Sequence, residues 1–468
     1  ARVDGRGAHH DICRMRKLRV APRVLRALQP IDAAGLGCAW GYGLLAWSAR
    51  QSGEPPLILF LAIAVWAALL TFGLYAYHRR HPEEAFPLER LIGWAILFRI
   101  FGLIGGPIYE DDFYRYLWDA FRFAQDGTPY GVPPEAFFAD PGVPAHFQRI
   151  LDQVNYPELP TIYGPVTQIF FLLGYWLSPG SIVAVQVPLV LVDLLAIVLL
   201  LRLAPARGVL LYAWCPLVIK EIAFTAHPDG VAVSLLLGAV VLGQRERLRG
   251  AAVCLALAVG AKVLALLLVP FVLARARPVH WGMFAGTLAL LYLPFLLQGG
   301  TDLGTLVVFA REWEFNAAVF SFLKPWLSNS LARATCGLLL AGGLAWYYVV
   351  YRRSGPTAVP RGDWIFGGLL ALWPVVNAWY LLWLLPFAAI RPSAWAWTAS
   401  VTVLLSYVTG LNLDDLQMEP FGHPVWVRPV EYGLVALALL YDVRRRVRRG
   451  TEVRLHGRTE DRVPCTRE

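Results

Sequence analysis

The sequence carries little charge for its length. Only 16% of its 468 residues are Asp, Glu, Lys or Arg, whereas 57% are hydrophobic. A soluble globular domain has about 25% charged and about 45–50% apolar residues. Apolar runs of roughly 18–22 residues, long enough to cross a hydrocarbon core of ~30 Å, recur along the chain. This composition argues against a soluble protein and predicts an all-α, polytopic integral membrane protein.

Cysteine is scarce, and several common motifs are missing. The six cysteines form no CxxC pair, and most lie in apolar runs, which indicates packing rather than disulfide or metal chemistry. A phosphate-binding GxxxxGK[ST] loop, an HExxH pattern and an internal repeat are all absent. We therefore expect neither a bound metal nor a cofactor.

The net charge of +9 would suit nucleic acid, but its placement indicates a membrane partner. Basic residues gather near both ends and in short connections between apolar runs, as the positive-inside rule describes for cytoplasmic segments. We expect no nucleic-acid partner and cytoplasmic termini. The basic groups lie at residues 14–26, 79–80, 245–249, 275–277, 352–353 and 444–449.

The expected organisation is a basic N-terminal tail (1–32), a transmembrane domain (33–443) and a basic C-terminal tail (444–468). About 12–14 helices should cross or re-enter the membrane. Two long loops, 108–160 and 299–333, should lie outside, and helical patterns at 111–125 and 146–153 predict that the first is structured. The apolar segments are 33–49, 55–76, 89–106, 166–178, 182–203, 209–225, 228–243, 250–274, 281–298, 335–351, 364–390, 394–410 and 427–442.

Strict alternation of crossings would place residues 245–249 outside, against the charge distribution. Segment 209–225 could resolve this as a broken or re-entrant helix. Segment 250–274, with Lys262 at mid-length, could instead be two half-helices. Non-helical backbone at membrane depth is tolerated only where it lines a cavity, so each alternative predicts a polar site.

A burst of charge follows the third apolar run. Three adjacent acids, Glu110, Asp111 and Asp112, precede a cluster of aromatic and charged residues that ends at Asp119. Ionisable groups at a membrane interface are costly to keep, so the stretch is a candidate functional site.

Helix geometry would separate the two aspartates. Neighbours point about 100° apart, so Asp111 would lie over Arg115, and Asp112 over Tyr116 and Asp119. One acid could be held by Arg115 while the other takes the proton from an attacking hydroxyl. The alternative is a helix-capping acid cluster with a surface Asp111–Arg115 pair.

Four ionisable residues interrupt a later apolar region. Lys220 or His227 could bind a phosphate, and Asp229 could orient that cation or a sugar hydroxyl. The alternative is a structural network between helices that includes Glu221. Asp193, within a span, is interpreted as a structural interhelical contact.

Two further cations and an aromatic segment are weaker candidates. Lys262, alone in an apolar run, needs an anion such as a lipid phosphate, or must extend to the interface. Arg311 could act similarly, although a solvated charge cluster with Glu312 and Glu314 is the simpler interpretation. Residues 373–383, with Trp379 and Tyr380, could form a membrane aromatic belt or a platform for a sugar or isoprenoid.

Four of these motifs together resemble a known group, the bacterial GT-C glycosyltransferases. The similarity is to polyprenol-phosphomannose-dependent alpha-mannosyltransferases and the related glycosylphosphatidylinositol mannosyltransferases, over about residues 90–390. The first external loop is the most specific match. The motifs are Asp111–Asp119 with Gly127–Tyr130, then Pro157–Pro165, Cys215–Asp229 and Trp373–Tyr380.

The resemblance implies a GT-C-like enzyme of the bacterial inner membrane with an external active site. The donor would be a polyprenyl-phosphate hexose, with mannose expected first, and the acceptor a lipid-linked or other glycan. Transfer would invert the anomeric carbon, with Asp111 as the base and Asp112 its rival. A phosphate leaving group needs a cation, for which Lys220, His227, Lys262 and Arg311 are the candidates. Supporting roles fall to Glu110, Arg115, Tyr116, Asp119, Tyr163, Glu221, Asp229, Trp379 and Tyr380.

The chain departs from the family pattern at several positions. Gly164 stands where the family often has proline, and Cys215 where it often has asparagine. Asn377–Ala378 replaces a His-Pro pair, and Pro228 also differs. These departures leave open a catalytically silent homologue with a binding role. A separate alternative is a transporter or flippase of lipid-linked sugars, which would need acids at mid-membrane in an inverted repeat.

Overall fold

The computed structural model describes residues 29–355 and 357–460 of the chain. Most of the predicted N-terminal tail (1–32) and the end of the predicted C-terminal tail lie outside these ranges. Within them every regular element is a helix, which confirms the predicted fold class. One isolated bridge, between Phe315 and Val375, is the single strand-like pairing of the described residues.

Few of the helices are long, apolar and unbroken. Within the described residues four helices are long and apolar enough to cross a membrane, and a fifth crossing arises if one bent pair counts as a span. The sequence predicts about 12–14 crossing or re-entrant segments, several of which are short or broken in the structure. The four helices are α2 (Leu57–Arg80), α7 (Ile182–Leu200), α13 (Pro278–Leu297) and α16 (Asn329–Arg352).

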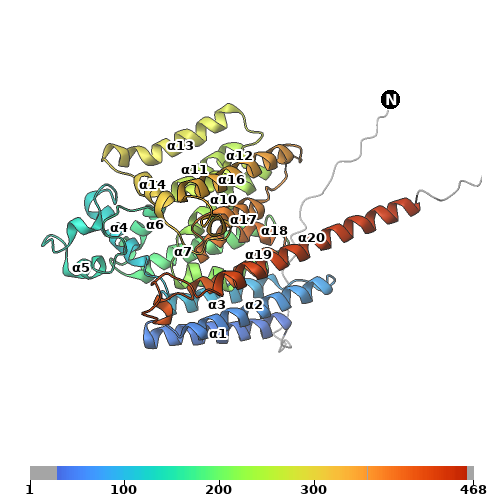
Figure 1. Cartoon of the computed structure of the whole chain (residues 1–468), viewed down its shortest axis with the longest axis horizontal. Helices are drawn as coiled ribbons and strands as arrows, with labels where there is room; N and C mark the ends of the chain where they lie inside the picture. The colour runs from blue at the N-terminus through green and yellow to red at the C-terminus, as the bar shows by residue number, and fades with distance from the viewer. Residues whose placement is uncertain (1–28, 356, 461–468) are drawn as a thin grey trace, which may run out of the picture.

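The first three helices pack together, and the third leads into the acidic stretch. Helices α1 (Pro30–Ser52) and α3 (Leu88–Gly105) pack on each other and α1 packs on α2, forming the blue layer in Figure 1. Near the end of α3, Arg50 Nε donates to the Ile104 carbonyl at 2.6 Å. The chain leaves α3 at Gly106 with φ 78°, which favours glycine.

The first long loop is structured, as its sequence predicts. It holds α4 (Phe113–Asp126), η1 (Pro134–Phe137) and α5 (Ala145–Leu151), and leads into α6 (Pro165–Leu177). Helix α4 packs on α6, and α6 packs on α7, so this loop is held against the helical bundle.

Both alternatives for the middle of the chain occur together. The segment from α8 (Ala206–Ala213) continues through α9 (Pro216–Val218) into the π-helical turn η2 (Ile219–Phe224). The α9–η2 unit meets α10 (Asp229–Gln244) at a bend of 118°. Helix α11 (Leu248–Ala261) then stops at Lys262, whose backbone is extended. The chain continues as η3 (Val263–Leu268) and α12 (Val269–Val272).

The break at Lys262 turns the chain back to the end of the bundle from which α11 starts. Gln244, Glu246, Arg275 and Ala358 line one cavity of about 320 Å³. Arg275 also donates to the Arg352 carbonyl at 3.3 Å. The connections after α10, α12 and α16 therefore meet at one end of the bundle. The α11–η3–α12 hairpin leaves this end and returns to it, so the basic groups of these three connections share one side.

A second broken hairpin follows later in the chain. Helix α17 (Gly362–Leu372) stops before η4 (Ala378–Trp383), and α18 (Leu385–Ile390) completes the hairpin. The break near residues 374–377 is the one that the sequence predicts. Phe315 N donates to the Pro374 carbonyl at 3.0 Å and Val376 N to the Phe315 carbonyl at 2.8 Å, so the second long loop touches this break.

The remaining helices close the bundle. The second long loop contains α14 (Leu303–Glu312) and α15 (Val319–Leu323). Helix α20 (Val427–Glu460), red in Figure 1, packs on α19 (Ala394–Thr402) and runs unbroken past the predicted tail boundary at residue 444. Between them lie η5 (Val403–Tyr407) and η6 (Leu411–Leu413).

A sealed ion pair joins α3, α7 and α8. Arg99 Nε lies 2.6 Å from Asp193 Oδ2, and both side chains are fully buried. Arg99 also donates to the Ala95 and Ala213 carbonyls, and the Tyr212 hydroxyl donates to Asp193 Oδ1 at 2.8 Å. The interpretation of Asp193 as a structural interhelical contact is confirmed.

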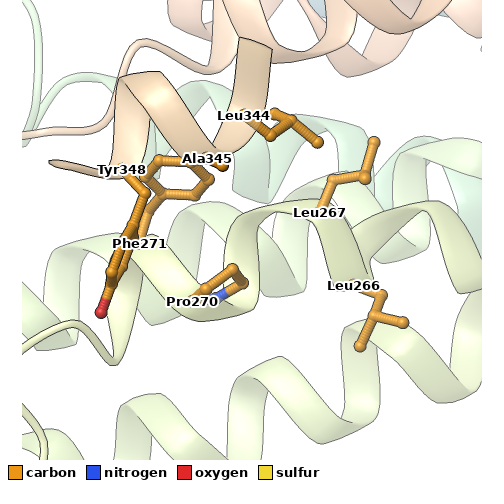
Figure 2. A pocket seen from close by; sticks show the side chains of 7 residues that line it. All are labelled: Leu266, Leu267, Pro270, Phe271, Leu344, Ala345 and Tyr348. Atoms are coloured by element: carbon orange, nitrogen blue, oxygen red, sulfur yellow. The ribbon is translucent and has the colours of Figure 1, made fainter. Parts of the chain in front are cut away.

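An apolar cavity of about 310 Å³ lies between η3–α12 and α16 (Figure 2). Two leucines of η3, Pro270, Phe271 and three residues of α16 line it, among them Tyr348. Its lining carries no charged side chain, so it is separate from the polar residues described next.

Candidate active site

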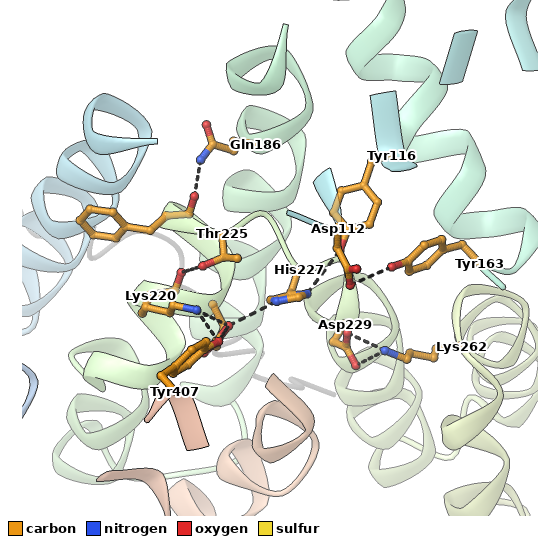
Figure 3. Close-up of polar contacts among 12 residues, drawn as sticks. Asp112, Tyr116, Tyr163, Gln186, Lys220, Thr225, His227, Asp229, Lys262 and Tyr407 are labelled. Carbon is orange, nitrogen blue, oxygen red and sulfur yellow. Dashed lines mark hydrogen bonds and ion pairs between the residues drawn. The ribbon is translucent and has the colours of Figure 1, made fainter. Parts of the chain in front are cut away.

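The breaks in the helices bring distant polar residues together. The bend before α10, the tip after α11 and the end of η5 contribute side chains to one group, together with residues of the first long loop and of the segment that follows it (Figure 3). Trp383 of the turn η4 donates a hydrogen bond to this group. We call this group the polar cluster. Its members are Asp112, Tyr116, Tyr163, Lys220, Glu221, His227, Asp229, Lys262 and Tyr407.

Asp112 is the acid of the first loop that enters the cluster. It immediately precedes α4 and is half-buried. The Tyr163 hydroxyl donates to Asp112 Oδ2 at 3.3 Å. Burial and the neighbouring Asp111 charge raise the pKa of Asp112 to about 6, while the Tyr163 hydrogen bond and the positive charges of Lys262 and Arg115 oppose this rise. Asp112 is therefore a carboxylate that can accept a proton near neutral pH.

Asp111 has a different setting. It is exposed and accepts a hydrogen bond from Asn155 Nδ2. Burial by the surrounding loop raises its pKa, and the Asn155 hydrogen bond lowers it. The expectation that Asp111 is the better placed base is not supported by this geometry, because Asp112, rather than Asp111, is hydrogen-bonded within the polar cluster.

The predicted Asp111–Arg115 pair does not form. Helix α4 begins only at Phe113, so Asp111 lies before the helix and the i,i+4 geometry does not apply. The buried Arg115 instead donates to the carbonyls of Asn155, Tyr156 and Leu159 at 2.8–3.0 Å. Arg115 thus fixes the segment that faces the aspartates rather than the aspartates themselves.

Asp119 also acts within the loop. Its Oδ2 accepts from Thr161 Oγ1 at 2.5 Å and from Gln168 Nε2 at 2.9 Å. Burial raises its pKa to about 6, and Arg115 and these two hydrogen bonds oppose the rise. Asp119 ties α4 to the segment that carries Tyr163, so its contacts are structural.

Lys220 and Glu221 form a closed network. The Lys220 ammonium lies 3.3 Å from Glu221 Oε2 and donates to the Tyr407 hydroxyl, which itself donates to Glu221 Oε1 at 3.0 Å. Both charged side chains are almost fully buried. Glu110 lies nearby: burial raises its pKa, and the Lys220 charge opposes that rise. The predicted structural network around Lys220 and Glu221 is therefore present.

The π-helical turn η2 and the sharp bend after it place these residues. Thr225 N and Thr225 Oγ1 both donate to the Lys220 carbonyl, at 2.9 and 3.0 Å. Ala226 then has φ 64°, an uncommon value for a residue with a Cβ. The bend points His227 and Asp229 back toward the residues of η2, and π-helical turns are frequent at functional sites.

His227 connects the two sides of the cluster. The Tyr116 hydroxyl lies 3.3 Å from His227 Nδ1, and His227 Nε2 lies 3.4 Å from Glu221 Oε2. The Trp379 ring stacks on the imidazole with a centroid distance of 3.9 Å. The histidine is buried, hydrogen-bonded at Nδ1 and stacked on one face, which favours a positioning role.

Lys262 is paired but not sealed. Its ammonium donates to both carboxylate oxygens of Asp229 at 2.7–2.8 Å, and Trp383 Nε1 donates to Asp229 Oδ1 at 2.7 Å. The Asp229 side chain is fully buried, whereas 23% of the Lys262 side chain is exposed. The Tyr380 ring lies 5.0 Å from the ammonium. Lys262 is therefore a fixed cation with an open side.

Of the remaining predicted residues, two aromatics lie beside the polar cluster and one arginine does not. Trp379 and Tyr380 face the polar cluster through His227 and Lys262, which favours the platform interpretation over a lipid-facing belt. Arg311 is exposed at the end of α14, and no hydrogen bond or ion pair among the described residues joins it to the cluster. In that loop Glu314 instead pairs with Lys324 at 2.5 Å.

Three contributors are not singled out by the sequence. Tyr407 lies in an apolar segment that resembles an ordinary span, and Trp383 is one of several aromatics at 373–383; both are far along the chain from their partners Glu221 and Asp229. Asn155 opens a Pro/Tyr-rich segment in which nothing marks its amide. Each becomes visible only when the broken hairpins bring distant segments together.

An all-helical membrane chain whose breaks gather paired carboxylates and cations has the architecture of a membrane-embedded enzyme. Over residues 34–277 the chain matches the family described as alpha-(1->6)-mannopyranosyltransferase, N-terminal domain. The match covers more than half of the chain, which therefore belongs to this family, as the motifs suggest. The matched range contains Asp112, Lys220 and Lys262, whereas Trp379 and Tyr407 lie beyond it.

A curated relative points to the same class. The chain is 24% identical to a probable alpha-(1->6)-mannopyranosyltransferase of Mycolicibacterium smegmatis, over 84% of this chain and 83% of the relative. No solved structure matches. Together with the helical fold, these matches support a membrane mannosyltransferase.

Proposed function

We propose that this protein transfers mannose from a polyprenyl-phosphate donor to a hydroxyl of a lipid-linked or other glycan, inverting the anomeric carbon. One observation carries the proposal: Asp112, a carboxylate able to accept a proton, and Lys262, a partly exposed cation, belong to the same polar cluster, and the positive charge of Lys262 opposes the rise in the pKa of Asp112. Glycosyl transfer from a phosphate needs these two groups, a base for the nucleophile and a cation for the leaving group.

Asp112 is the proposed base. The acceptor oxygen would attack the anomeric carbon, and its proton would pass to the Asp112 carboxylate. The Tyr163 hydroxyl holds that carboxylate by donating to Oδ2. The pKa of about 6 leaves most of Asp112 ionised at neutral pH while keeping it more basic than an ordinary aspartate.

Lys262 is the proposed cation for the leaving group. As the bond from the anomeric carbon to the phosphate oxygen breaks, the electron pair stays on the phosphate. The two bonds to Asp229 use two of the three N–H donors of an ammonium, so one remains for a phosphate oxygen. Asp229 and the Trp383 indole fix the ammonium in place.

Lys220 and His227 are assigned positioning roles. The buried Lys220 ammonium is neutralised by Glu221 and bonded to Tyr407, and His227 is held by Tyr116 and Trp379. These contacts fix the bend that carries Asp229. Arg311 is not assigned to the donor phosphate, because it lies outside the cluster.

The distribution of charge supports an external active site with cytoplasmic termini. Asp229 lies in the cluster at the start of α10, and Gln244 ends α10 beside the arginine-rich connections. A helix of 16 residues is about 24 Å long, so the cluster and the basic end lie on opposite sides of the bundle. Basic connections favour the cytoplasm, which supports an orientation with the cluster toward the outside of the bacterial inner membrane.

Transfer in liposomes tests the proposal. Purified protein receives labelled polyprenyl-phosphate mannose and a lipid extract as the acceptor. Labelled glycolipid should form with the wild type and be lost with Asp112→Asn. Movement of the donor across the bilayer with no new glycosidic bond would instead establish a flippase, and binding with neither outcome a silent homologue.

A further inference from the structure

One aromatic side chain beside the proposed base has no assigned role. Tyr156 follows Asn155 in the first long loop, and 44% of it is exposed. Burial of the rest and the negative charges of Asp112, Glu158 and Asp111 raise the pKa of its hydroxyl. The ring therefore lies within the electrostatic reach of both aspartates while one part of it remains open.

The backbone around Tyr156 is firmly held. Arg115, a buried residue of α4, donates to the Asn155 carbonyl at 2.9 Å and to the Tyr156 carbonyl at 2.8 Å. Asn155 Nδ2 donates to Asp111 Oδ1. An exposed aromatic at the tip of a free loop would be mobile, whereas this one is tied to α4 and to the acidic stretch.

Tyr156 also contacts the second long loop. The ring of Trp313 lies 4.9 Å from that of Tyr156, centroid to centroid, in an edge-to-face arrangement. Trp313 is itself fixed, because Arg333 Nη2 donates to its carbonyl at 3.0 Å. The two loops thus present an aromatic pair at one edge of the aspartates.

The local conformation is uncommon. Tyr156 has φ 51°, a left-handed value that costs a residue with a Cβ free energy. Tyr109 and Ala226, which also have positive φ, directly precede Glu110 and His227. Backbone strain of this kind gathers at functional sites, and among these three residues Tyr156 is the one whose side chain is exposed and open to a ligand.

We propose that Tyr156 and Trp313 form the platform on which the acceptor sugar ring stacks, with Asp111 and Asn155 binding its hydroxyls. This inference rests on the proposed function and adds the acceptor subsite to it. The ligand class is a pyranose at the end of a lipid-linked or other glycan.

The chemistry of a pyranose fits this surface. One face of the ring presents C–H bonds, which are attracted to the negative face of an aromatic ring. Its edges carry hydroxyls, for which the exposed Asp111 carboxylate is an acceptor and the Asn155 amide offers both kinds of group. An acceptor held there would have one hydroxyl directed at Asp112, which follows Asp111 in the chain. The two aspartates then differ in role: Asp111 orients the acceptor and Asp112 takes the proton.

Acceptor kinetics with an alkyl mannoside as the probe test this platform. Tyr156→Ala and Trp313→Ala should each raise the acceptor KM roughly tenfold, the effect of losing one stacking contact. The donor KM should not change. Tyr156→Phe should keep most of the acceptor affinity. Phe138→Ala removes another exposed aromatic of the same loop and should leave both KM values unchanged.

The outcomes separate this inference from the proposed function. If the wild type transfers no mannose, the proposed function fails. If the wild type transfers mannose and Tyr156→Ala has an unchanged acceptor KM, the platform is wrong. Tyr156→Gly permits the left-handed backbone without the ring, so it distinguishes loss of stacking from distortion of the loop. If both Tyr156→Ala and Tyr156→Gly fail to fold, the acceptor KM of Trp313→Ala tests the platform. Equal increases in the donor and acceptor KM would also overturn the platform.

Discussion

Two ion pairs within the helical bundle differ in how far solvent reaches their cation. Arg99 and Asp193 join α3 to α7, and both side chains are sealed from solvent. Lys262 and Asp229 join the tip after α11 to the start of α10, and their acid is equally buried. The lysine, however, is partly exposed, whereas the arginine is surrounded by carbonyl acceptors.

The difference lies in what remains for a ligand. Arg99 donates to Asp193 and to two carbonyls from a position closed to solvent, and a tyrosine hydroxyl also donates to Asp193. Lys262 is bound by a single carboxylate at the turn between two short helices. A cation can be bound by one carboxylate and still be accessible to a second anion when the helix that carries it ends beside it. Four predictions test this comparison.

The largest effect is expected at Asp112, the acid of the open region. Asp112→Asn removes the proposed base and should lower kcat by roughly 10²–10⁴-fold, with little change in the thermal unfolding midpoint. Asp111→Asn is the matched control one residue away. It should retain kcat within about tenfold and weaken acceptor binding, since we assign Asp111 to orientation. Kinetics with both substrates varied measures this, and a dead Asp111→Asn with an active Asp112→Asn would reverse the assignment.

Asp193→Ala should act on stability alone. Removing one partner of a buried pair leaves Arg99 uncompensated, at a cost of about 3–5 kcal/mol. Thermal unfolding in detergent should show a lower midpoint, and the folded fraction should keep its kcat. A variant that folds normally but loses transfer would show that this pair belongs to the reaction, and the contrast with Lys262 would collapse.

Lys262→Ala should produce the opposite pattern. Loss of the cation should lower kcat/KM for the donor by roughly 10²–10³-fold, in the range measured for removing one group that stabilises a developing charge. Stability should fall less than in Asp193→Ala, because solvent reaches this position. Lys262→Arg keeps the charge and should restore part of the activity. If both variants transfer mannose at the wild-type rate, another group binds the phosphate.

The smallest effect is a shift in pH dependence. The acid limb of kcat/KM should follow the ionisation of Asp112, whose pKa is about 6. A base works only when deprotonated, so activity should fall as the pH drops through this value. The Tyr163 hydrogen bond stabilises the carboxylate and lowers its pKa, so Tyr163→Phe should raise the pKa and move the limb to higher pH. An unmoved limb would show that another group controls it.

Much of the fold follows from local pattern. Apolar runs and basic connections predict a polytopic helical protein, and the breaks at Lys262 and near Pro374 are visible because polar or proline residues interrupt those runs. The sequence could not establish how many segments cross unbroken. Proline and charge can bend, shorten or end a helix, and the choice depends on tertiary contacts far along the chain.

The sequence predicts many of the residues that belong to the site, but not which of them contact one another. The sequence identifies Asp112, Lys220, His227, Asp229 and Lys262 as costly polar groups. Their partners are set by the meeting of helix breaks that lie up to nearly 190 positions apart, as in the Lys220–Tyr407 contact. The predicted Asp111–Arg115 pair is wrong for a local reason: it assumes a helix that already includes Asp111, whereas α4 begins two residues later, at Phe113.

The contact between Gly164 and Gly260 has a consequence for how the site can vary. A Cβ on Gly164 would lie 2.4 Å from the Gly260 carbonyl oxygen, which is backbone and cannot rotate away. Gly164 follows Tyr163, and Gly260 lies two residues before Lys262, so this contact sets the spacing between the acceptor side and the donor side. Any side chain at residue 164 would push the segment that carries Tyr163 away from the tip that carries Lys262. The distance between these two parts of the polar cluster therefore depends on a residue that itself has no side chain.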